Sequence, residues 1–227
     1  MIKAVGFDID GTLYPSASLY LRMVPKTIGH LIFLLRYNWL RTQLRNDSFV
    51  RRYGFDTVSS IQEFHEKEAE TLAKHFGGNF DTIYEIMETC IYQKSETMFK
   101  HIKLFNGVET LLQTLQERGI PTGALSDFPA ETKLEYLSIK NYFNVIMTSE
   151  ATGKLKPFSE SFIRFSEALG VAPEHILYVG NSEKYDVLGA KTAGMQTALI
   201  KRSWKRSQAD FVFSSYKELE NYIVTHL

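Results

Sequence analysis

The chain has 227 residues, 44% of them hydrophobic and 23% charged, which is typical of a globular protein with one large domain or one domain that carries an insertion. Its 26 basic and 26 acidic residues balance, so no overall charge favours nucleic acid or an anionic membrane as a partner. The single cysteine, Cys90, excludes an intrachain disulfide and a multi-thiolate zinc site, and is compatible with a cytoplasmic location.

The N-terminal segment predicts a buried strand that runs into two aspartates. Residues 2–7 are mostly apolar, and Asp8 and Asp10 follow them, with Gly11 and Thr12 next. Because the chain enters this strand almost at once, no signal peptide is expected. A carboxylate is costly to bury without a partner, so the pair indicates a bound cation, a proton held on one acid, or both.

Two interpretations of this aspartate pair remain open. In the functional one, Asp8 is a nucleophile and Asp10 is a general acid that later acts as a base. The two-residue period of a strand would then put both side chains on one face. In the structural one, they are turn carboxylates, one of which caps the next helix.

From about residue 16 to residue 101 the pattern is helical. Segments 17–46, 59–75 and 80–100 each suit a helix with one apolar face. The apolar stretch 31–35 is too short to span a bilayer and is interpreted as helix core, so no membrane association is expected. This region is predicted to be an inserted helical domain.

The remaining chain alternates between strands and helices. The predicted strands are 120–125, 143–147, 175–179, 195–200 and 210–213. The predicted helices are 107–118, 130–138, 159–169, 185–193 and 215–225. This alternation predicts an α/β fold with a doubly wound parallel sheet, built from residues 1–15 and 102–227, with residues 16–101 as an α-helical cap domain.

Two polar motifs follow the next predicted strands, where ligands bind in an open parallel sheet. Ser126 and Asp127 offer a hydroxyl and backbone N–H groups to a phosphoryl oxygen, or simply cap a helix. Pro157 restricts the backbone of the loop that carries Lys156. In the functional interpretation, Lys156 neutralises a carboxylate and a phosphate together; in the structural one, it is an ordinary exposed lysine of a loop.

A third polar motif, GNSEKYD at 180–186, follows the strand that ends near Val179. Its oxygen-bearing side chains, Asn181 and Asp186 among them, suit a hard cation such as Mg²⁺. Asp186 also suits the first turn of a helix, where its charge complements the helix dipole. The order of these motifs and their shared strand-end location point to phosphoryl transfer.

The ordered set resembles the haloacid dehalogenase-like (HAD) hydrolase superfamily, in the phosphatase branch with a helical cap inserted after the first motif. The matching motifs are DIDGTLY at 8–14, ALS at 124–126, GKLKP at 153–157 and VGNSEKYDVLGAKTAGM at 179–195. The resemblance covers the predicted core and implies a Rossmann-like sheet.

The resemblance also implies a mechanism on a small phosphorylated metabolite. Asp8 would attack phosphorus to form an aspartyl-phosphate, and Asp10 would protonate the leaving oxygen and then activate water. Ser126, Asp127 and Lys156 would bind the phosphoryl group, with Lys156 also balancing the charge of Asp8. A sugar phosphate, a phosphoglycolate-like acid and a nucleoside monophosphate would all fit.

The resemblance implies Mg²⁺ as the cofactor, held by the Asp8 carboxylate, the Asp10 carbonyl and the motif with Asn181 and Asp186. Phosphatases of the family usually have Gly-Asp where this chain has Gly180-Asn181, so weaker Mg²⁺ binding is expected.

Two alternatives remain open: a HAD-fold binding or regulatory protein with little turnover, which Asn181 favours, and a phosphomutase. A dehalogenase fits least, because its leaving halide needs no acid at the place of Asp10. Six cap residues are candidate substrate contacts: Tyr20, Arg22, Lys26, Arg36, Trp39 and Arg41. The sequence determines neither the substrate nor the oligomeric state.

Overall fold

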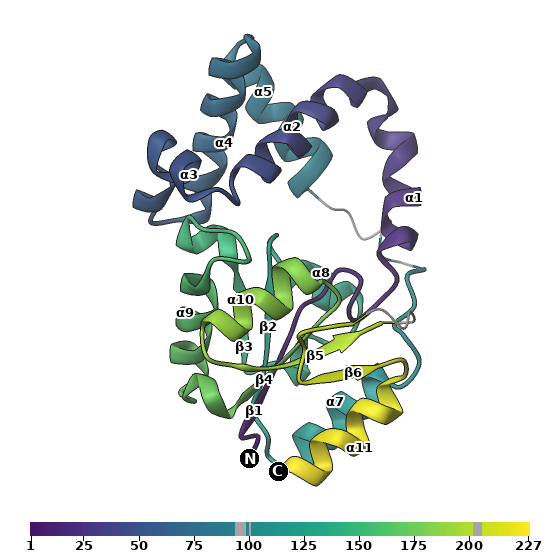
Figure 1. Cartoon of the computed structure of the whole chain (residues 1–227). Helices are drawn as coiled ribbons and strands as arrows, with labels where there is room; N and C mark the ends of the chain where they lie inside the picture. Colours follow the sequence, from purple (N-terminus) through teal and green to yellow (C-terminus); the bar gives the residue numbers. More distant parts are fainter. Residues whose placement is uncertain (94–98, 100, 202–205) are drawn as a thin grey trace.

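The computed structural model describes residues 1–93, 99, 101–201 and 206–227, and only the backbone of residues 20 and 23–28. Its centre is a six-stranded parallel sheet (Figure 1). The strands are β1 (Ala4–Phe7), β2 (Thr122–Ser126), β3 (Val145–Thr148), β4 (Ile176–Gly180), β5 (Gln196–Ile200) and β6 (Phe211–Phe213). Their order is β3-β2-β1-β4-β5-β6, which confirms the predicted doubly wound parallel sheet.

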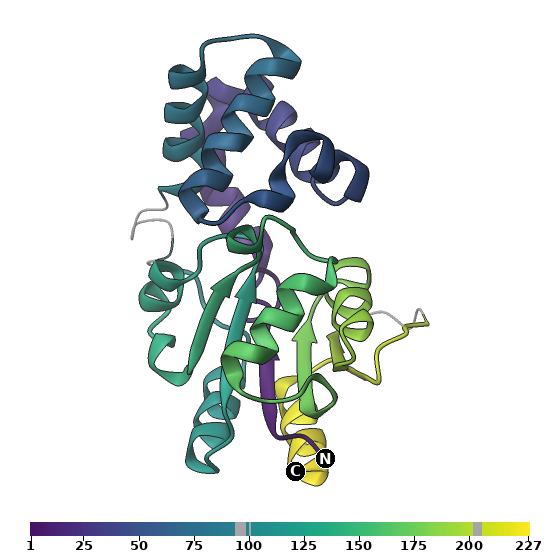
Figure 2. The ribbon, with the colours of Figure 1, turned by 90° about the vertical axis from the view of Figure 1, so that its left-hand side faces the viewer.

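Helices cover both faces of the sheet (Figure 2). One face is covered by α9 (Ser159–Leu169) and α10 (Leu188–Thr192). The other is covered by α7 (Val108–Glu117), α8 (Glu131–Tyr136) and α11 (Tyr216–His226). Successive side chains of β1 point to opposite faces of the sheet: Val5 packs against the layer of α7 and α11, and Ala4 packs against the layer of α9.

The central position of β1 places the first motif at the middle of the sheet edge. Phe7 pairs with Ala124 of β2 and with Val179 of β4, so the three strands end at nearly the same level. The backbone N–H of Asp8 continues this pairing by donating to the Val179 carbonyl at 2.9 Å. The groups that follow these strands are therefore brought together.

Residues 16–92 form a helical layer above the carboxyl edge of the sheet (Figure 1). We call Ser16–Tyr92 the helical insertion. Its helices are α1 (Ser16–Thr27), α2 (Leu31–Gln43), α3 (Asp47–Tyr53), α4 (Ile61–Phe76) and α5 (Phe80–Met87), followed by a π-helical turn (Glu88–Tyr92). Its apolar cluster includes Leu40, Phe55 and Phe64 and is shared with Leu155, which follows β3.

Two sequence expectations for the helical insertion are wrong in detail. Residues 17–46 do not form one helix, because a 3-10 turn at Ile28–His30 separates α1 from α2, and Asn46 starts α3 by accepting bonds from Ser48 N at 3.0 Å and Phe49 N at 3.3 Å. The stretch 31–35 is not wholly core: Leu31, Ile32 and Leu35 are exposed, since consecutive residues of a helix point in different directions. The end of the predicted helix 80–100 lies outside the described residues.

No helix in the described parts of the chain has both the length and the apolar character that crossing a membrane requires.

Candidate active site

Asp8 occupies the centre of the site, directly after β1. Its side chain is buried, and its two oxygens have different partners: Lys156 Nζ lies 2.7 Å from Oδ1, and Thr12 Oγ1 donates to Oδ2 at 2.7 Å. Burial raises the pKa of Asp8 to about 6, and the nearby Asp186 adds to the rise while Lys156 opposes it. The carboxylate is thus held in one orientation beside a fixed positive charge.

Lys156 lies between two buried carboxylates. Its Nζ is 2.7 Å from Asp8 Oδ1 and 2.7 Å from Asp186 Oδ1, and all three side chains are less than a tenth exposed. Burial alone would lower the pKa of Lys156, but the charges of Asp186 and Asp8 outweigh it and raise the pKa well above its usual value. The ammonium therefore stays charged at the floor of the site.

Asp186 organises the loop that follows β4. Its Oδ2 accepts hydrogen bonds from the backbone N–H groups of Asn181, at 3.1 Å, and Ser182, at 2.9 Å. The Asn181 side chain reaches across to the first motif, with Nδ2 3.3 Å from the Asp10 carbonyl oxygen. The motif at 180–186 is therefore in direct contact with the motif that contains Asp8 and Asp10.

Asp10 has partners that the sequence did not suggest. Its carboxylate accepts short contacts from the Tyr14 hydroxyl and from Nζ of Lys133, a buried lysine at the start of α8. A lone lysine in a short amphipathic helix carries no sequence signal for this role. The two donors fix the orientation of the Asp10 side chain at the mouth of the site.

Ser126 ends β2, and Asp127 begins the loop that follows it. The Ser126 hydroxyl is buried and accepts a hydrogen bond from Phe128 N at 3.2 Å. The Asp127 carboxylate is turned towards the helical insertion and pairs at 2.7 Å with Arg45, which lies in the turn between α2 and α3. Burial would raise the pKa of Asp127, but Arg45, Lys156 and Arg41 outweigh it and the pKa is lowered.

Arg45 connects the helical insertion to two motifs at once. One guanidinium nitrogen pairs with Asp127, and the other donates to the backbone carbonyl of Lys156. Arg41, one helical turn earlier, donates to the Asp127 carbonyl at 2.5 Å. Arg41 is among the sequence candidates and Arg45 is not, because Arg45 lies in the turn after α2 and carries no distinguishing sequence signal.

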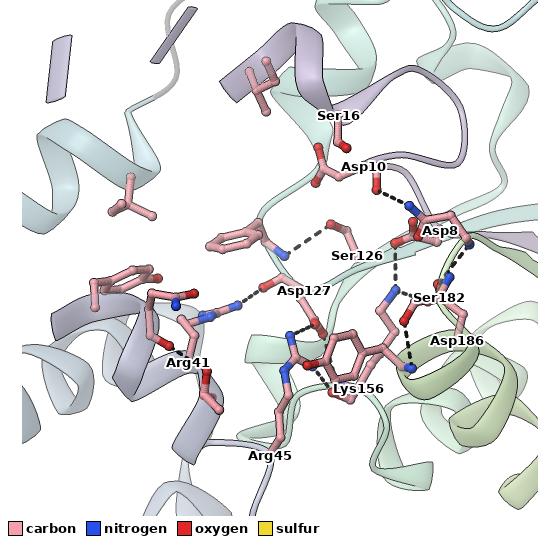
Figure 3. Close-up of a pocket in the computed structure, with 18 of the residues that line it drawn as sticks. Asp8, Asp10, Ser16, Arg41, Arg45, Ser126, Asp127, Lys156, Ser182 and Asp186 are labelled. Carbon is pink, nitrogen blue, oxygen red and sulfur yellow. Dashed lines mark hydrogen bonds and ion pairs between the residues drawn. The ribbon is translucent and has the colours of Figure 1, made fainter. Parts of the chain in front are cut away.

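These groups line a cavity of about 580 Å³ between the sheet edge and the helical insertion (Figure 3). The sheet side supplies every predicted site residue: Asp8, Asp10, Ser126, Asp127, Lys156, Asn181 and Asp186. The insertion contributes Ser16, Leu19, Leu34, Tyr37, Asn38, Arg41, Thr42, Arg45 and Ile91. Arg22, Arg36 and Trp39 do not line it, and the side chains of Tyr20 and Lys26 lie outside the described part.

The donor set beside Asp8 suits a hard cation. The Asp8 carboxylate, the Asp10 carbonyl and the Asn181 amide converge there, and half a turn of that amide exchanges its nitrogen for its oxygen. No cluster of three His, Cys, Asp or Glu side chains suited to a metal occurs within 1–93, 99, 101–201 and 206–227. A cation here would depend on carbonyl and amide oxygens as well as on one carboxylate.

Comparison with known proteins agrees with this geometry. A family model described as haloacid dehalogenase-like hydrolase matches residues 5–200. Glyceraldehyde 3-phosphate phosphatase of Methanopyrus kandleri is 32% identical over 205 residues, covering 89% of this chain and 85% of that protein. Phosphoglycolate phosphatase of Escherichia coli is 26% identical, covering 96% of this chain and 91% of its own length.

Solved structures share the fold. A HAD phosphatase from Thermococcus onnurineus superposes with a TM-score of 0.65 at 24% identity, covering 98% of each chain. A 2-haloacid dehalogenase from Pseudomonas syringae superposes with a TM-score of 0.68 at 18% identity, covering 100% of each chain. With a family model spanning most of its length, a relative at 32% identity and the motifs assembled around Asp8, the chain belongs to the haloacid dehalogenase-like hydrolase family and is an enzyme of that kind.

Proposed function

We propose that this enzyme is a Mg²⁺-dependent phosphatase that hydrolyses a small phosphorylated metabolite through an aspartyl-phosphate on Asp8. The observation that carries the proposal is the buried row Asp8–Lys156–Asp186, which places a fixed cation against a carboxylate at the floor of a cavity. Phosphoryl transfer depends on such positioning and charge neutralisation. The relatives named as phosphatases support the same reaction class.

In the proposed reaction the Asp8 carboxylate attacks phosphorus and the ester P–O bond breaks, while Asp10 gives its proton to the leaving oxygen. Water then attacks the aspartyl-phosphate, Asp10 takes up a proton from that water, and phosphate and free Asp8 are formed. The contacts from Lys133 and Tyr14 favour the ionised form of Asp10, which is the form that takes up a proton from water in the second step.

Ser126 and Lys156 would bind the phosphoryl oxygens. Asp127 would contribute its backbone only, because its carboxylate is committed to Arg45 and to Ser149 Oγ, 2.6 Å away. Mg²⁺ would be held by Asp8, the Asp10 carbonyl and Asn181 and would neutralise phosphate charge. Asp186 would orient that loop through its bonds to the Asn181 and Ser182 N–H groups.

We further propose that the helical insertion acts as a cap over the core, residues 1–15 and 102–227. Its helix α2 and the turn after it form a wall of the cavity and contact the loops after β2 and β3 through Arg41 and Arg45. Closure of such a layer excludes water during phosphoryl transfer.

The test is release of phosphate from p-nitrophenyl phosphate with and without Mg²⁺. We expect metal-dependent release by the wild type and none by Asp8→Asn. The exposed Asp81 of α5 provides the matched control, because Asp81→Asn makes the same chemical change far from the cavity and should keep wild-type activity. Equal activity of Asp8→Asn and wild type would refute the role of Asp8.

Asn181 favours a second candidate, a member of the family that binds phosphate esters with little turnover. The Asn181 amide offers a neutral oxygen where a charged one would bind Mg²⁺ more strongly. Calorimetric titration with Mg²⁺ separates the two: no measurable binding by the wild type, restored in Asn181→Asp together with activity, would favour this candidate.

A further inference from the structure

We infer that the phosphate ester taken by this site has an uncharged leaving group, such as a polyol, sugar or nucleoside, and that acids of the phosphoglycolate type are discriminated against. This inference rests on the proposed function. It follows from the way in which the described cations that line the cavity are already neutralised by carboxylates of the protein.

Arg41 is the cation on the insertion side that lies deepest. Its Nη1 is 3.0 Å from Glu68 Oε1 and 2.6 Å from Glu150 Oε1, and both of these carboxylates are fully buried. Turning the guanidinium towards a bound carboxylate would remove the arginine charge from two buried carboxylates and leave His65, 3.3 Å from Glu150, as the remaining basic partner, which is strongly unfavourable. Arg41 is therefore not available to an acidic substrate.

Arg45 is also held by contacts within the protein. It pairs with Asp127 at 2.7 Å, donates to the Lys156 carbonyl, and lies flat on the Tyr185 ring, with the guanidinium carbon 3.9 Å from the ring centre. Lys156 itself is shared by Asp8 and Asp186. Among the described residues that line the cavity, each of the three cations is thus matched by at least one carboxylate of the protein.

The other described residues of the helical insertion that line the cavity are neutral. Leu19, Leu34 and Ile91 supply apolar surface, and Asn38 and Thr42 supply groups that donate or accept hydrogen bonds. A hydroxylated, uncharged leaving group can replace its hydrogen bonds to water with hydrogen bonds to Asn38 and Thr42. A carboxylate in the same place would lose hydration without meeting a free cation among the described lining residues.

The first arm of the test compares esters that differ in one carboxylate. We would measure kcat/KM with Mg²⁺ for 2-hydroxyethyl phosphate against phosphoglycolate, and for glycerol 3-phosphate against 3-phosphoglycerate. We expect the neutral member of each pair to be favoured at least tenfold. A preference for the acidic member, or equal values, would overturn the inference.

A second arm measures binding of the same four esters to Asp8→Asn by calorimetry, so that the result does not depend on turnover. If wild type hydrolyses nothing but Asp8→Asn binds the neutral esters more tightly, the proposed function fails and the inference holds. If the acidic esters bind as tightly or more tightly, or if no ester binds, the inference fails.

A third arm adds a cation to the neutral wall. Asn38 is exposed on α2 and lines the cavity, so Asn38→Lys introduces an ammonium without an assigned partner, and Asn38→Gln adds length without charge. Relative to Asn38→Gln, Asn38→Lys should improve the ratio of phosphoglycolate to 2-hydroxyethyl phosphate about tenfold. An unchanged ratio would show that wall charge does not set specificity.

Discussion

Replacing Arg41 by methionine tests whether buried charges hold the helical insertion against the sheet. The substitution keeps much of the volume but removes the cation that lies 3.0 Å from Glu68 and 2.6 Å from Glu150. Both carboxylates are fully buried, and breaking one side of a buried ionic cluster costs about 3–5 kcal/mol. Since domains are stable by only about 5–15 kcal/mol, the variant should lose a large share of its stability.

The assay is urea unfolding at pH 7.5, followed by tryptophan fluorescence, to which Trp39 in the same helix contributes. Arg51→Met is the matched control: Arg51 pairs with Asp47 at 2.7 Å, but the two side chains are 68% and 44% exposed, so a loss of about 0.5 kcal/mol or less is expected. Equal losses in Arg41→Met and Arg51→Met would refute the reasoning.

The deficit of Arg41→Met should also depend on pH. Burial and the charge of Glu150 raise the pKa of Glu68 even in the wild type, where Arg41 opposes the rise. Without Arg41 the folded state should hold a proton on Glu68 more strongly than the unfolded state does, so stability is lost as the pH rises. The difference between variant and wild type should be larger at pH 8 than at pH 5, and a constant difference would contradict this explanation.

Three further predictions concern single positions. Burial would lower the pKa of His65, but its bond to Glu150 and the nearby acidic charges outweigh burial and raise the pKa. His65→Gln should therefore reduce the free energy of unfolding most below pH 6.5, and progressively less as the pH rises through the folded-state pKa. A pH-independent loss in urea unfolding would contradict this prediction. Asn181→Asp should tighten Mg²⁺ binding about tenfold or more by calorimetry, because a charged oxygen replaces a neutral one, and unchanged affinity would place the cation elsewhere. Gly153 has φ +70°, and a Cβ atom there would lie 1.9 Å from the Phe55 carbonyl oxygen. Gly153→Ala should therefore lower stability by about 1–3 kcal/mol in thermal unfolding. The loss should exceed that of Gly119→Ala, because Gly119 has a similar φ but open space around it.

The sequence determined the sheet and the floor of the site. Strand–helix alternation predicted a parallel sheet, and its strands lie within about two residues of their expected positions because continuous apolar runs mark buried strands. Ser126 ends β2, and Asp8, Lys156 and Asn181 follow other strands. Because parallel strands end at one edge, the convergence of these residues followed from chain order and spacing.

Only the tertiary structure decided which charges neutralise one another. Lys133 contacts Asp10 across 123 residues of chain, Arg45 contacts Asp127 across 82, and Arg41 contacts Glu150 across 109. Each partner by itself looks like an ordinary charged residue of a helix or loop, because pairing depends on how the insertion packs over the sheet rather than on spacing. The same reason applies to Leu31 and Ile32, whose exposure follows from the orientation of α2 and not from their apolar character.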